Sequence, residues 1–242
     1  MARPRKRHVQ QEMVFRTWGG RRPGAGRKQT KARKSEPHRK REELNPIHPV
    51  HVILRVLHDV GAMRKRHIYE AMRRATFKVL GRADFRICHV SIQNTHVHLL
   101  VEATNEMRLA RGMQAFQISA ARRINLAVSR RTGEKRSGRV FSDRYRTKVI
   151  DNPRQARHTL SYVLNNWRKH GEDRRSVARN WKVDPFSTAM AFYGWKEQPP
   201  YWSTPETFQR LGVMCPETWL LYAAWERYAP ISVYDVPSRP WT

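Results

Sequence analysis

Two histidines, His96 and His98, stand two residues apart in an alternating stretch that runs from position 93 to position 102. The stretch is rich in β-branched and aliphatic residues, which is typical of a β-strand. Because side chains alternate between the two faces of a strand, both imidazoles point the same way and lie about 6–7 Å apart. This spacing suits two ligands of one metal ion. The alternative is a partly exposed strand face that carries two histidines without a ligand.

A tyrosine, Tyr162, lies in a segment that is predicted to be helical from Asn152-Pro153 to about position 170, where Gly171 stops it. At about 100° per residue, the apolar positions of this helix form one stripe: Leu160, Val163, Leu164 and Trp167. Tyr162 and Asn166 fall together on another side, one turn apart. We therefore expect the phenol to face away from the core. It is either an ordinary surface tyrosine or a group presented to a substrate.

The rest of the chain alternates strands with helices. The predicted elements are a strand over 49–57, a helix over 63–81, strands over 85–92 and 93–102, a helix over 105–131, a strand or a bent approach to one over 138–150, and the tyrosine helix. The two middle strands are joined so tightly that we expect an antiparallel hairpin. A chain of 242 residues is long enough for one sizeable core with extensions.

The chain is strongly basic, with 48 Lys and Arg against 20 Asp and Glu and a net charge of +28. Such a charge resists compaction unless an anionic partner is present. Nucleic acid is the first candidate partner, and an anionic membrane surface is the weaker one. No apolar run reaches about 18 residues and no apolar leader follows the basic N-terminus, so we expect no membrane span and no secretion. Two cysteines cannot build a disulfide framework or a zinc knuckle, and a cytoplasmic protein is expected.

The N-terminal segment reads as a basic arm. Residues 1–41 hold 15 Lys and Arg and two acids, a net charge of 15 − 2 = +13, so we expect residues 1–45 to be disordered when free. Glycines and a proline within 19–26 would hold arginines on a narrow backbone that enters a DNA minor groove or follows phosphates. The alternative is a solvated tail with non-specific attraction. The candidate nucleic-acid contacts are Arg21, Arg22, Arg27 and Lys28 in this arm, and Arg122, Arg123 and Arg144 further along.

The C-terminal segment, residues 172–242, is richer in aromatic residues than the rest of the chain. Prolines interrupt it, its periodicity is weak, and aromatic residues recur along it from Trp181 to Trp241. We expect an extension that packs over the core through these rings. The alternative is base stacking on single-stranded nucleic acid. The core domain is then predicted over 46–171.

Three short motifs follow one another in the core domain. The first is Asn94-Thr95-His96-Val97-His98-Leu99, the second runs from Gly138 to Tyr145 with a Gly-Arg-Val-Phe-x-x-Arg-Tyr pattern, and the third is Tyr162-Val163-Leu164-Asn165-Asn166-Trp167. Their order and spacing resemble those of the HUH single-tyrosine transposases, above all the REP-associated tyrosine transposases. The resemblance covers residues 48–171. The third motif has an asparagine four residues after the tyrosine but lacks the proline that is usual in that family.

The resemblance implies a fold and a site. The fold would be α+β, a ferredoxin-like or RRM-like antiparallel sheet with helices, known as the HUH endonuclease fold. Tyr162 would be the nucleophile, and His96, His98 and Asn166 would hold a divalent Mg²⁺ or Mn²⁺. The alternatives for the third ligand are Asn165 and His158. The implied partner is single-stranded DNA that carries a hairpin, bound by a monomer or a homodimer.

The implied chemistry is the cleavage and rejoining of DNA without an energy source. This requires a covalent intermediate that stores the phosphodiester bond, here a 5′-phosphotyrosine with a free 3′-hydroxyl. A divalent metal would polarise the scissile phosphate. Manganese tolerates imidazole better than magnesium does, whereas magnesium is the usual ion of the family.

Two rival functions remain open from the sequence. A non-enzymatic nucleic-acid-binding protein with an RRM-like sheet would explain the charge, the rings and the basic arm equally well. A metal-dependent nuclease that uses water would explain the histidines without needing Tyr162. If the nucleophile lies elsewhere, Tyr145 is the next candidate.

Overall fold

The computed structural model describes residues 42–174, 180–197 and 209–238. The candidate contacts of the arm, Arg21, Arg22, Arg27 and Lys28, lie outside these residues, so their role stays a prediction. By its internal contacts the chain divides into two units, Met1–Lys34 and Ser35–Thr242, and every described residue belongs to the second unit.

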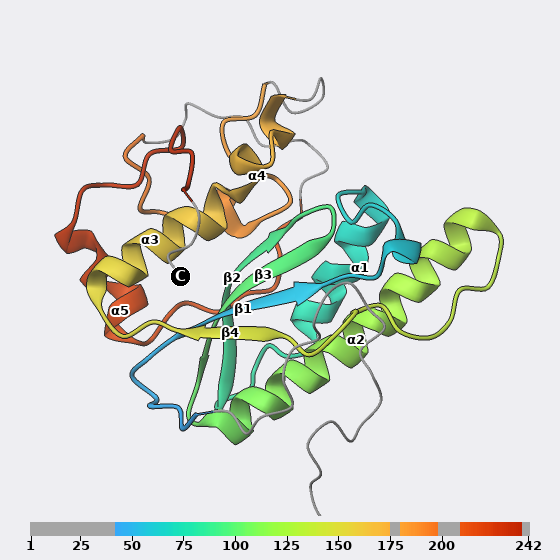
Figure 1. Cartoon of the computed structure of the whole chain (residues 1–242), viewed down its shortest axis with the longest axis horizontal. Helices are drawn as coiled ribbons and strands as arrows, with labels where there is room; N and C mark the ends of the chain where they lie inside the picture. The colour runs from blue at the N-terminus through green and yellow to red at the C-terminus, as the bar shows by residue number, and fades with distance from the viewer. Residues whose placement is uncertain (1–41, 175–179, 198–208, 239–242) are drawn as a thin grey trace, which may run out of the picture. The chain divides into compact units, whose positions relative to one another are not determined.

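Four strands form one antiparallel sheet in the order β2-β3-β1-β4 (Figure 1). The strands are β1 (Val50–Arg55), β2 (Phe85–Ile92), β3 (His96–Ala103) and β4 (Arg146–Val149), and the helices between them are α1 (Arg66–Phe77) and α2 (Glu106–Thr132). Along the chain these elements run β1-α1-β2-β3-α2-β4, which is the order of ferredoxin-like folds. The predicted α+β class with a ferredoxin-like antiparallel sheet is confirmed.

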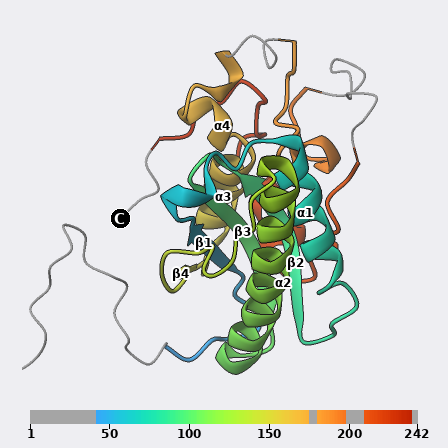
Figure 2. The same cartoon turned by 90° about the vertical axis from the view of Figure 1, so that its right-hand side faces the viewer.

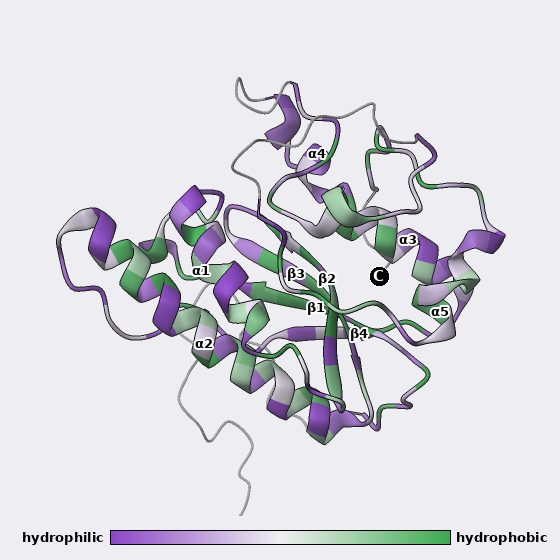
Figure 3. Ribbon diagram, turned by 180° about the vertical axis from the view of Figure 1, so that it is seen from behind, coloured by the Kyte–Doolittle hydropathy of each residue, from purple (hydrophilic) through white to green (hydrophobic). Residues whose placement is uncertain are grey.

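One face of the sheet is covered by α1 and α2 (Figure 2). The core on this face is apolar and joins both helices to every second residue of β1 and β3: Val50, Val52, Leu54, Val97, Leu99 and Val101. At the start of α2 the Asn105 side chain accepts a hydrogen bond from the backbone N–H of Arg108, and Gly133 ends the helix in the left-handed conformation. Hydrophobic and hydrophilic segments alternate along α2 in Figure 3, as expected for a helix with one buried stripe.

The opposite face of the sheet is covered by α3 and the C-terminal extension. The elements here are α3 (Pro153–Leu164), α4 (Asn166–Lys169), α5 (Trp219–Tyr222) and the short 3₁₀ turns η2 (Glu172–Arg174), η3 (Thr188–Ala191) and η4 (Ala224–Arg227). A further 3₁₀ turn, η1 (His58–Val60), follows β1. The rings of Phe192, Trp195 and Trp225 are buried in one cluster with α3, so the expected packing of the extension over the core is confirmed for these inner rings. Trp219 and Tyr222 are exposed.

Two predicted elements need comment. For residues 138–150 the second of the two expectations, a bent approach to a strand, is confirmed: the strand itself is β4, and a bridge between Phe141 and Val56 lies on the approach to it. The helix predicted over 152–170 breaks at Asn165, where the backbone has φ −102° and ψ 11°. At that break the Asn165 side chain donates a hydrogen bond to the Ser232 carbonyl at 2.9 Å, so a contact with the extension accompanies the interruption.

Strand β2 carries one extra residue. Its pairing with β3 shifts between Ile87 and His89, which makes a β-bulge at Cys88. As a result Val90 returns to the apolar face that Ile87 occupies. His89 turns toward the extension, where its Nδ1 lies 3.2 Å from Thr188 Oγ1.

Candidate active site

Strand β3 brings His96 and His98 to the face of the sheet that α3 covers. Their ring centroids are 4.7 Å apart with the rings nearly perpendicular, so the predicted pairing of the two imidazoles is confirmed as geometry. His98 is only 1% exposed, whereas His96 is partly open to solvent. His98 is therefore the buried member of the pair, and His96 is the accessible member.

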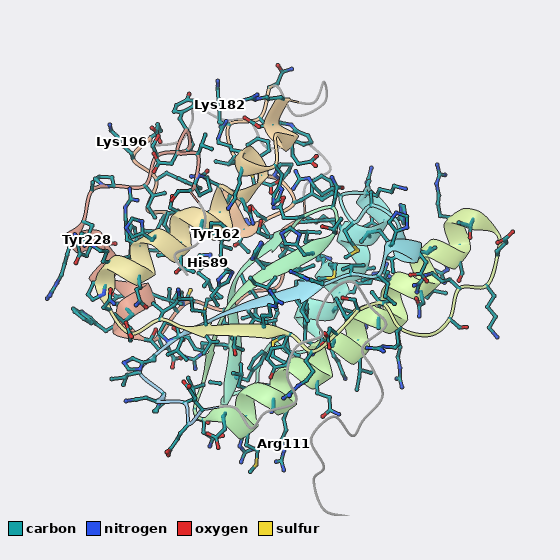
Figure 4. All side chains as sticks on the ribbon, viewed as in Figure 1. His89, Arg111, Tyr162, Lys182, Lys196 and Tyr228 are labelled. Carbon is teal, nitrogen blue, oxygen red and sulfur yellow. The ribbon has the colours of Figure 1, made fainter. Side chains whose placement is uncertain are left out.

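Tyr162 lies on α3, where Figure 4 labels it, and contacts His98 of this pair. Its ring meets the His98 ring edge-on at 5.3 Å between centroids. The expectation that Tyr162 faces away from the core on a polar surface is wrong, because it is 9% exposed and part of the second hydrophobic cluster. The sheet covers one side of α3 and the extension covers another. The side that carries Tyr162 is therefore buried as well, although it lies outside the apolar stripe.

The Tyr162 phenol is held in a mixed environment. Burial raises its pKa, and the Asn166 amide beside it acts in the opposite direction. The Lys169 ammonium lies 4.7 Å from the centre of the phenol ring. Tyr145, the other tyrosine considered as a nucleophile, is buried in the first core with α1 and α2, on the other side of the sheet from the histidines.

Asn166 is completely buried at the start of α4, where its amide lies close enough to the Tyr162 phenol to lower the pKa of the phenol, but neither amide atom has a partner of normal hydrogen-bond geometry among the described groups. An unpaired buried amide is costly, which makes a missing partner at this position informative. Asn165 also has a buried amide oxygen without a hydrogen-bond partner among the described groups, and its amide nitrogen donates to the Ser232 carbonyl, so Asn165 stays an alternative ligand. His158 is exposed, one turn before Tyr162 on α3.

The imidazoles are held in their neutral form. Burial, together with the nearby charges of His170 and Arg55, lowers the pKa of His96 to about 4. Burial also lowers the pKa of His98 well below its ordinary value. Both rings therefore carry a lone pair at neutral pH, and the Nε2 atom of His98 is buried without a hydrogen-bond partner among the described groups. A nitrogen with a free lone pair is what a metal ion requires.

The donor set around Tyr162 fits a divalent ion only if an amide takes part. In residues 42–174, 180–197 and 209–238, no three His, Cys, Asp or Glu side chains are grouped so that they could hold a metal. His96 and His98 offer two imidazole nitrogens, and Asn166 offers an unpaired oxygen. Two imidazoles and one oxygen suit Mn²⁺ better than Mg²⁺, which prefers oxygen ligands.

Two further histidines join the cluster, and sequence reasoning missed both. His51 on β1 lies with its ring centroid 5.1 Å from that of His98 and 5.9 Å from that of Tyr162. His170, at the end of α4, lies 5.3 Å from His96. A usable signal existed for His51, because it interrupts the valines of β1 and must therefore point to the face opposite to them.

A buried charge network holds the histidine strand to the end of the tyrosine helix. Arg64 donates two hydrogen bonds to the Asp184 carboxylate, at 2.8 and 2.9 Å, and one to the Ile92 carbonyl at 3.0 Å. Its Nε lies 3.8 Å from Glu172, which in turn accepts a hydrogen bond from Asn94 just before β3. The network therefore ties the turn that precedes His96 to the segment that follows α4.

A cavity of about 330 Å³ opens beside Tyr162. His51, Lys148 and Arg157 line it, and residues 235–238 of the extension form part of its wall. Its volume lies in the range of small-ligand sites, which is about 300–1,000 Å³. Its wall carries two cationic side chains suited to a phosphate-bearing group, and one of them, Arg157, is paired with the Asp235 carboxylate of the same wall at 3.6 Å.

Two of the candidate nucleic-acid contacts outside the arm lie on the other side of the sheet from this site. Arg122 and Arg123 belong to α2, which covers the other face of the sheet, and Figure 4 labels Arg111 on the same helix. Arg144 lies on the approach to β4, and its backbone N–H is bonded to the Asp143 side chain. The structure thus brings together the histidines, Tyr162 and Asn166, and it does not place Arg122 and Arg123 on their face of the sheet. No helix in the described part of the chain is long and apolar enough to cross a membrane.

The central part of the chain is similar to known proteins. Residues 47–166 match the family described as "Transposase IS200 like". A search of curated proteins gives no match. The similar solved structures include the REP-associated tyrosine transposase bound to a REP hairpin, with 17% identity and a TM-score of 0.48, over 75% of this chain and 100% of that one. A bacterial tRNA(His) guanylyltransferase (Thg1)-like protein in complex with GTP has 15% identity and a TM-score of 0.39, over 57% of this chain and 68% of that one.

The matched segment 47–166 contains all four strands and ends at Asn166, and it includes both histidines of β3 together with Tyr162. Through this segment the chain belongs to the IS200-like transposase family.

Proposed function

We propose that this chain cleaves and rejoins single-stranded DNA at hairpins, in a metal-dependent reaction with Tyr162 as the nucleophile. One observation carries the proposal: the Tyr162 ring packs against His98 at 5.3 Å, next to an unpaired His98 nitrogen and an unpaired Asn166 amide. The hairpin substrate comes from the family resemblance, and the transposase family itself is shown by the match over residues 47–166.

In the proposed reaction the Tyr162 oxygen attacks the scissile phosphorus. A bond forms between phosphorus and the phenol oxygen, the bond from phosphorus to the 3′-oxygen breaks, and the phenol proton is lost while the 3′-oxygen gains one. The product is a 5′-phosphotyrosine and a free 3′-hydroxyl, which can later reverse the step on a new strand. A divalent ion, when bound, would polarise the phosphate and offset developing negative charge.

The residues of the chain have separate roles in this scheme. His96 and His98 would hold the ion with Asn166, and burial keeps both imidazoles neutral for that purpose. Packing of the Tyr162 ring against His98 would keep the nucleophile close to the ion. Lys148 and Arg157 would bind DNA phosphates at the cavity beside Tyr162. The basic arm over 1–41 would add affinity through phosphate contacts without contributing to the chemistry.

The test is the exchange of Tyr162 for phenylalanine. Incubation of the protein with Mn²⁺ and hairpin-bearing single-stranded DNA should give a protein–DNA adduct that survives denaturation, linked to the 5′ side of the break. Tyr162→Phe keeps the packed ring and removes the attacking oxygen, so the adduct should vanish while thermal stability and DNA binding remain. Tyr145→Phe is the matched control, because it removes the hydroxyl of a buried tyrosine on the other side of the sheet.

The rival functions separate in the same experiment. A nuclease that uses water would still cut DNA with Tyr162→Phe. A protein that only binds DNA would form no adduct with any variant. An adduct that persists in Tyr162→Phe and disappears in Tyr145→Phe would move the nucleophile to Tyr145.

A further inference from the structure

A histidine outside the sequence motifs contacts the buried member of the histidine pair. His51 Nε2 on β1 lies 3.0 Å from His98 Nδ1 on β3, a hydrogen-bond distance. Both side chains are buried, with 4% and 1% exposure. His51 therefore occupies one of the two ring nitrogens of His98, while the other, Nε2, has no partner among the described groups.

The two nitrogens of a neutral imidazole are not equivalent, because one carries the hydrogen and the other carries the lone pair. A metal can bind only the nitrogen with the lone pair. If His98 Nε2 is the ligand atom, the hydrogen must be on Nδ1, and Nδ1–H then donates to the lone pair of His51 Nε2. The opposite arrangement would leave an Nε2–H group of His98 buried without an acceptor, which is the costlier state.

We infer that His51 is a positioning residue for the metal site: by accepting a hydrogen bond from His98 Nδ1, it fixes the tautomer and ring orientation that aim Nε2 of His98 at the ion. The inference rests on the metal site of the proposed function. Histidine ligands in metal sites commonly donate their second N–H to a carboxylate, a carbonyl or water. Here the acceptor of that N–H is the imidazole of His51.

The fold makes His51 a rigid support. β1 is flanked by β3 on one side and β4 on the other, so its backbone is hydrogen-bonded along both edges. His51 and His98 sit on adjacent strands, and their rings lie 23° from parallel at 5.1 Å. On its other side His51 lines the cavity beside Tyr162. His51 thus lies between His98, the candidate metal ligand, and the cavity that the substrate would enter.

The experiment compares two substitutions of His51 in the full chain, without DNA. His51→Met replaces the acceptor nitrogen by a thioether, which is only a weak acceptor, in a side chain of similar length. His51→Gln keeps an acceptor oxygen at about the reach of Nε2. Mn²⁺ affinity, followed by electron paramagnetic resonance, should fall about 10–100-fold in His51→Met, the usual effect of losing such a support. His51→Gln should bind Mn²⁺ close to the wild-type level.

A second measurement reports the tautomer itself. Nitrogen-15 NMR of the metal-free wild-type protein should show His98 protonated at Nδ1, and His51→Met should lose that preference. His89→Met is the matched control, since it removes another buried histidine of the same sheet, one that contacts Thr188 instead of the cluster. It should leave Mn²⁺ affinity unchanged.

Several results would overturn the inference. Wild-type Mn²⁺ affinity in His51→Met would do so, as would His51→Gln binding as weakly as His51→Met while melting like the wild type. A wild-type His98 protonated at Nε2 would do the same. Failure of the proposed metal site looks different: His96→Ala would then bind Mn²⁺ as well as the wild type does, and both proposals would fall together.

Discussion

Both faces of the sheet carry a buried apolar cluster, but the α3 face also holds the histidines and the Tyr162 phenol. On the α1/α2 face, β3 contributes Val97, Leu99 and Val101 to an apolar core. On the α3 face the same strand contributes His98, which meets Tyr162, and the Asn166 amide lies beside that phenol. The first face removes hydrocarbon from water, which stabilises the fold. The second buries polar atoms without partners, which costs stability and has to be explained by function.

This difference shows why burial alone does not separate a core from a site. Leu99 is completely buried and His98 is 1% exposed, and they are neighbours in the sequence. What separates them is whether their polar atoms find partners within the protein. Because the α3 face leaves His98 Nε2 and the Asn166 amide unsatisfied, we expect substitutions there to change ligand binding more than folding, and the reverse on the α1/α2 face.

The largest effect on stability is expected on the α1/α2 face. Phe116 of α2 is completely buried in that core, so Phe116→Ala should lower the free energy of unfolding by about 3–5 kcal/mol, through lost burial and the cavity left behind. Urea denaturation measures this change. Ile118→Ala is the control, because Ile118 is 47% exposed on the same helix and should change stability much less. A Phe116→Ala variant as stable as the wild type would remove the contrast between the faces.

A smaller effect is expected on the α3 face. His98→Leu leaves the buried His51 Nε2 without its partner and should cost about 1–3 kcal/mol of unfolding free energy in a chelator, while abolishing Mn²⁺ binding. Replacing both partners, as in His51→Leu with His98→Leu, should recover much of that loss, because no polar atom of the pair is then left unpaired. If the double variant were less stable than His98→Leu alone, the pair would be a structural element and the comparison would fail.

The smallest effect concerns surface charge near each face. Lys169 is partly exposed on α4 beside Tyr162, and its charge acts on both His96 and His98. Lys169→Met should tighten Mn²⁺ binding by about 2–5-fold at low salt, less at high salt, because it removes a repulsive positive charge. Arg122→Met removes an exposed charge from α2 and should leave the affinity unchanged. Calorimetric titration of Mn²⁺ into each variant, without DNA, measures the two affinities. It tests whether only charges on the α3 face act on the metal site.

Much of the fold followed from local patterns. The strand predicted over 85–92 has the bounds of β2, and the helix predicted over 105–131 differs from α2 by one residue at each end. Both follow from apolar periodicity and from end signals such as Asn105 and Gly133, which act within one turn of the helix. The paired histidines were predictable for the same reason, because alternation along a strand is a local property.

Other features depended on contacts between distant parts of the chain. The bulge at Cys88 redirects His89, which alternation alone would place with Ile87. A glycine in the middle of α2 is unfavourable by propensity, yet at Gly112 a Cβ atom would lie 2.1 Å from the Phe85 ring, so the close approach of β2 requires it. No property of the residues adjacent to these positions signals such contacts.

The sequence by itself determined the element order, the basic character of the chain and the shared face of His96 and His98. These are consequences of period, charge and spacing along one element. The tertiary structure alone decided that Tyr162 is buried, that His51 supports His98, and that α2 carries Arg122 and Arg123 on the opposite face from the site. The physical reason is that such features arise where separate elements meet, and which elements meet is set by how the whole sheet packs on both of its faces.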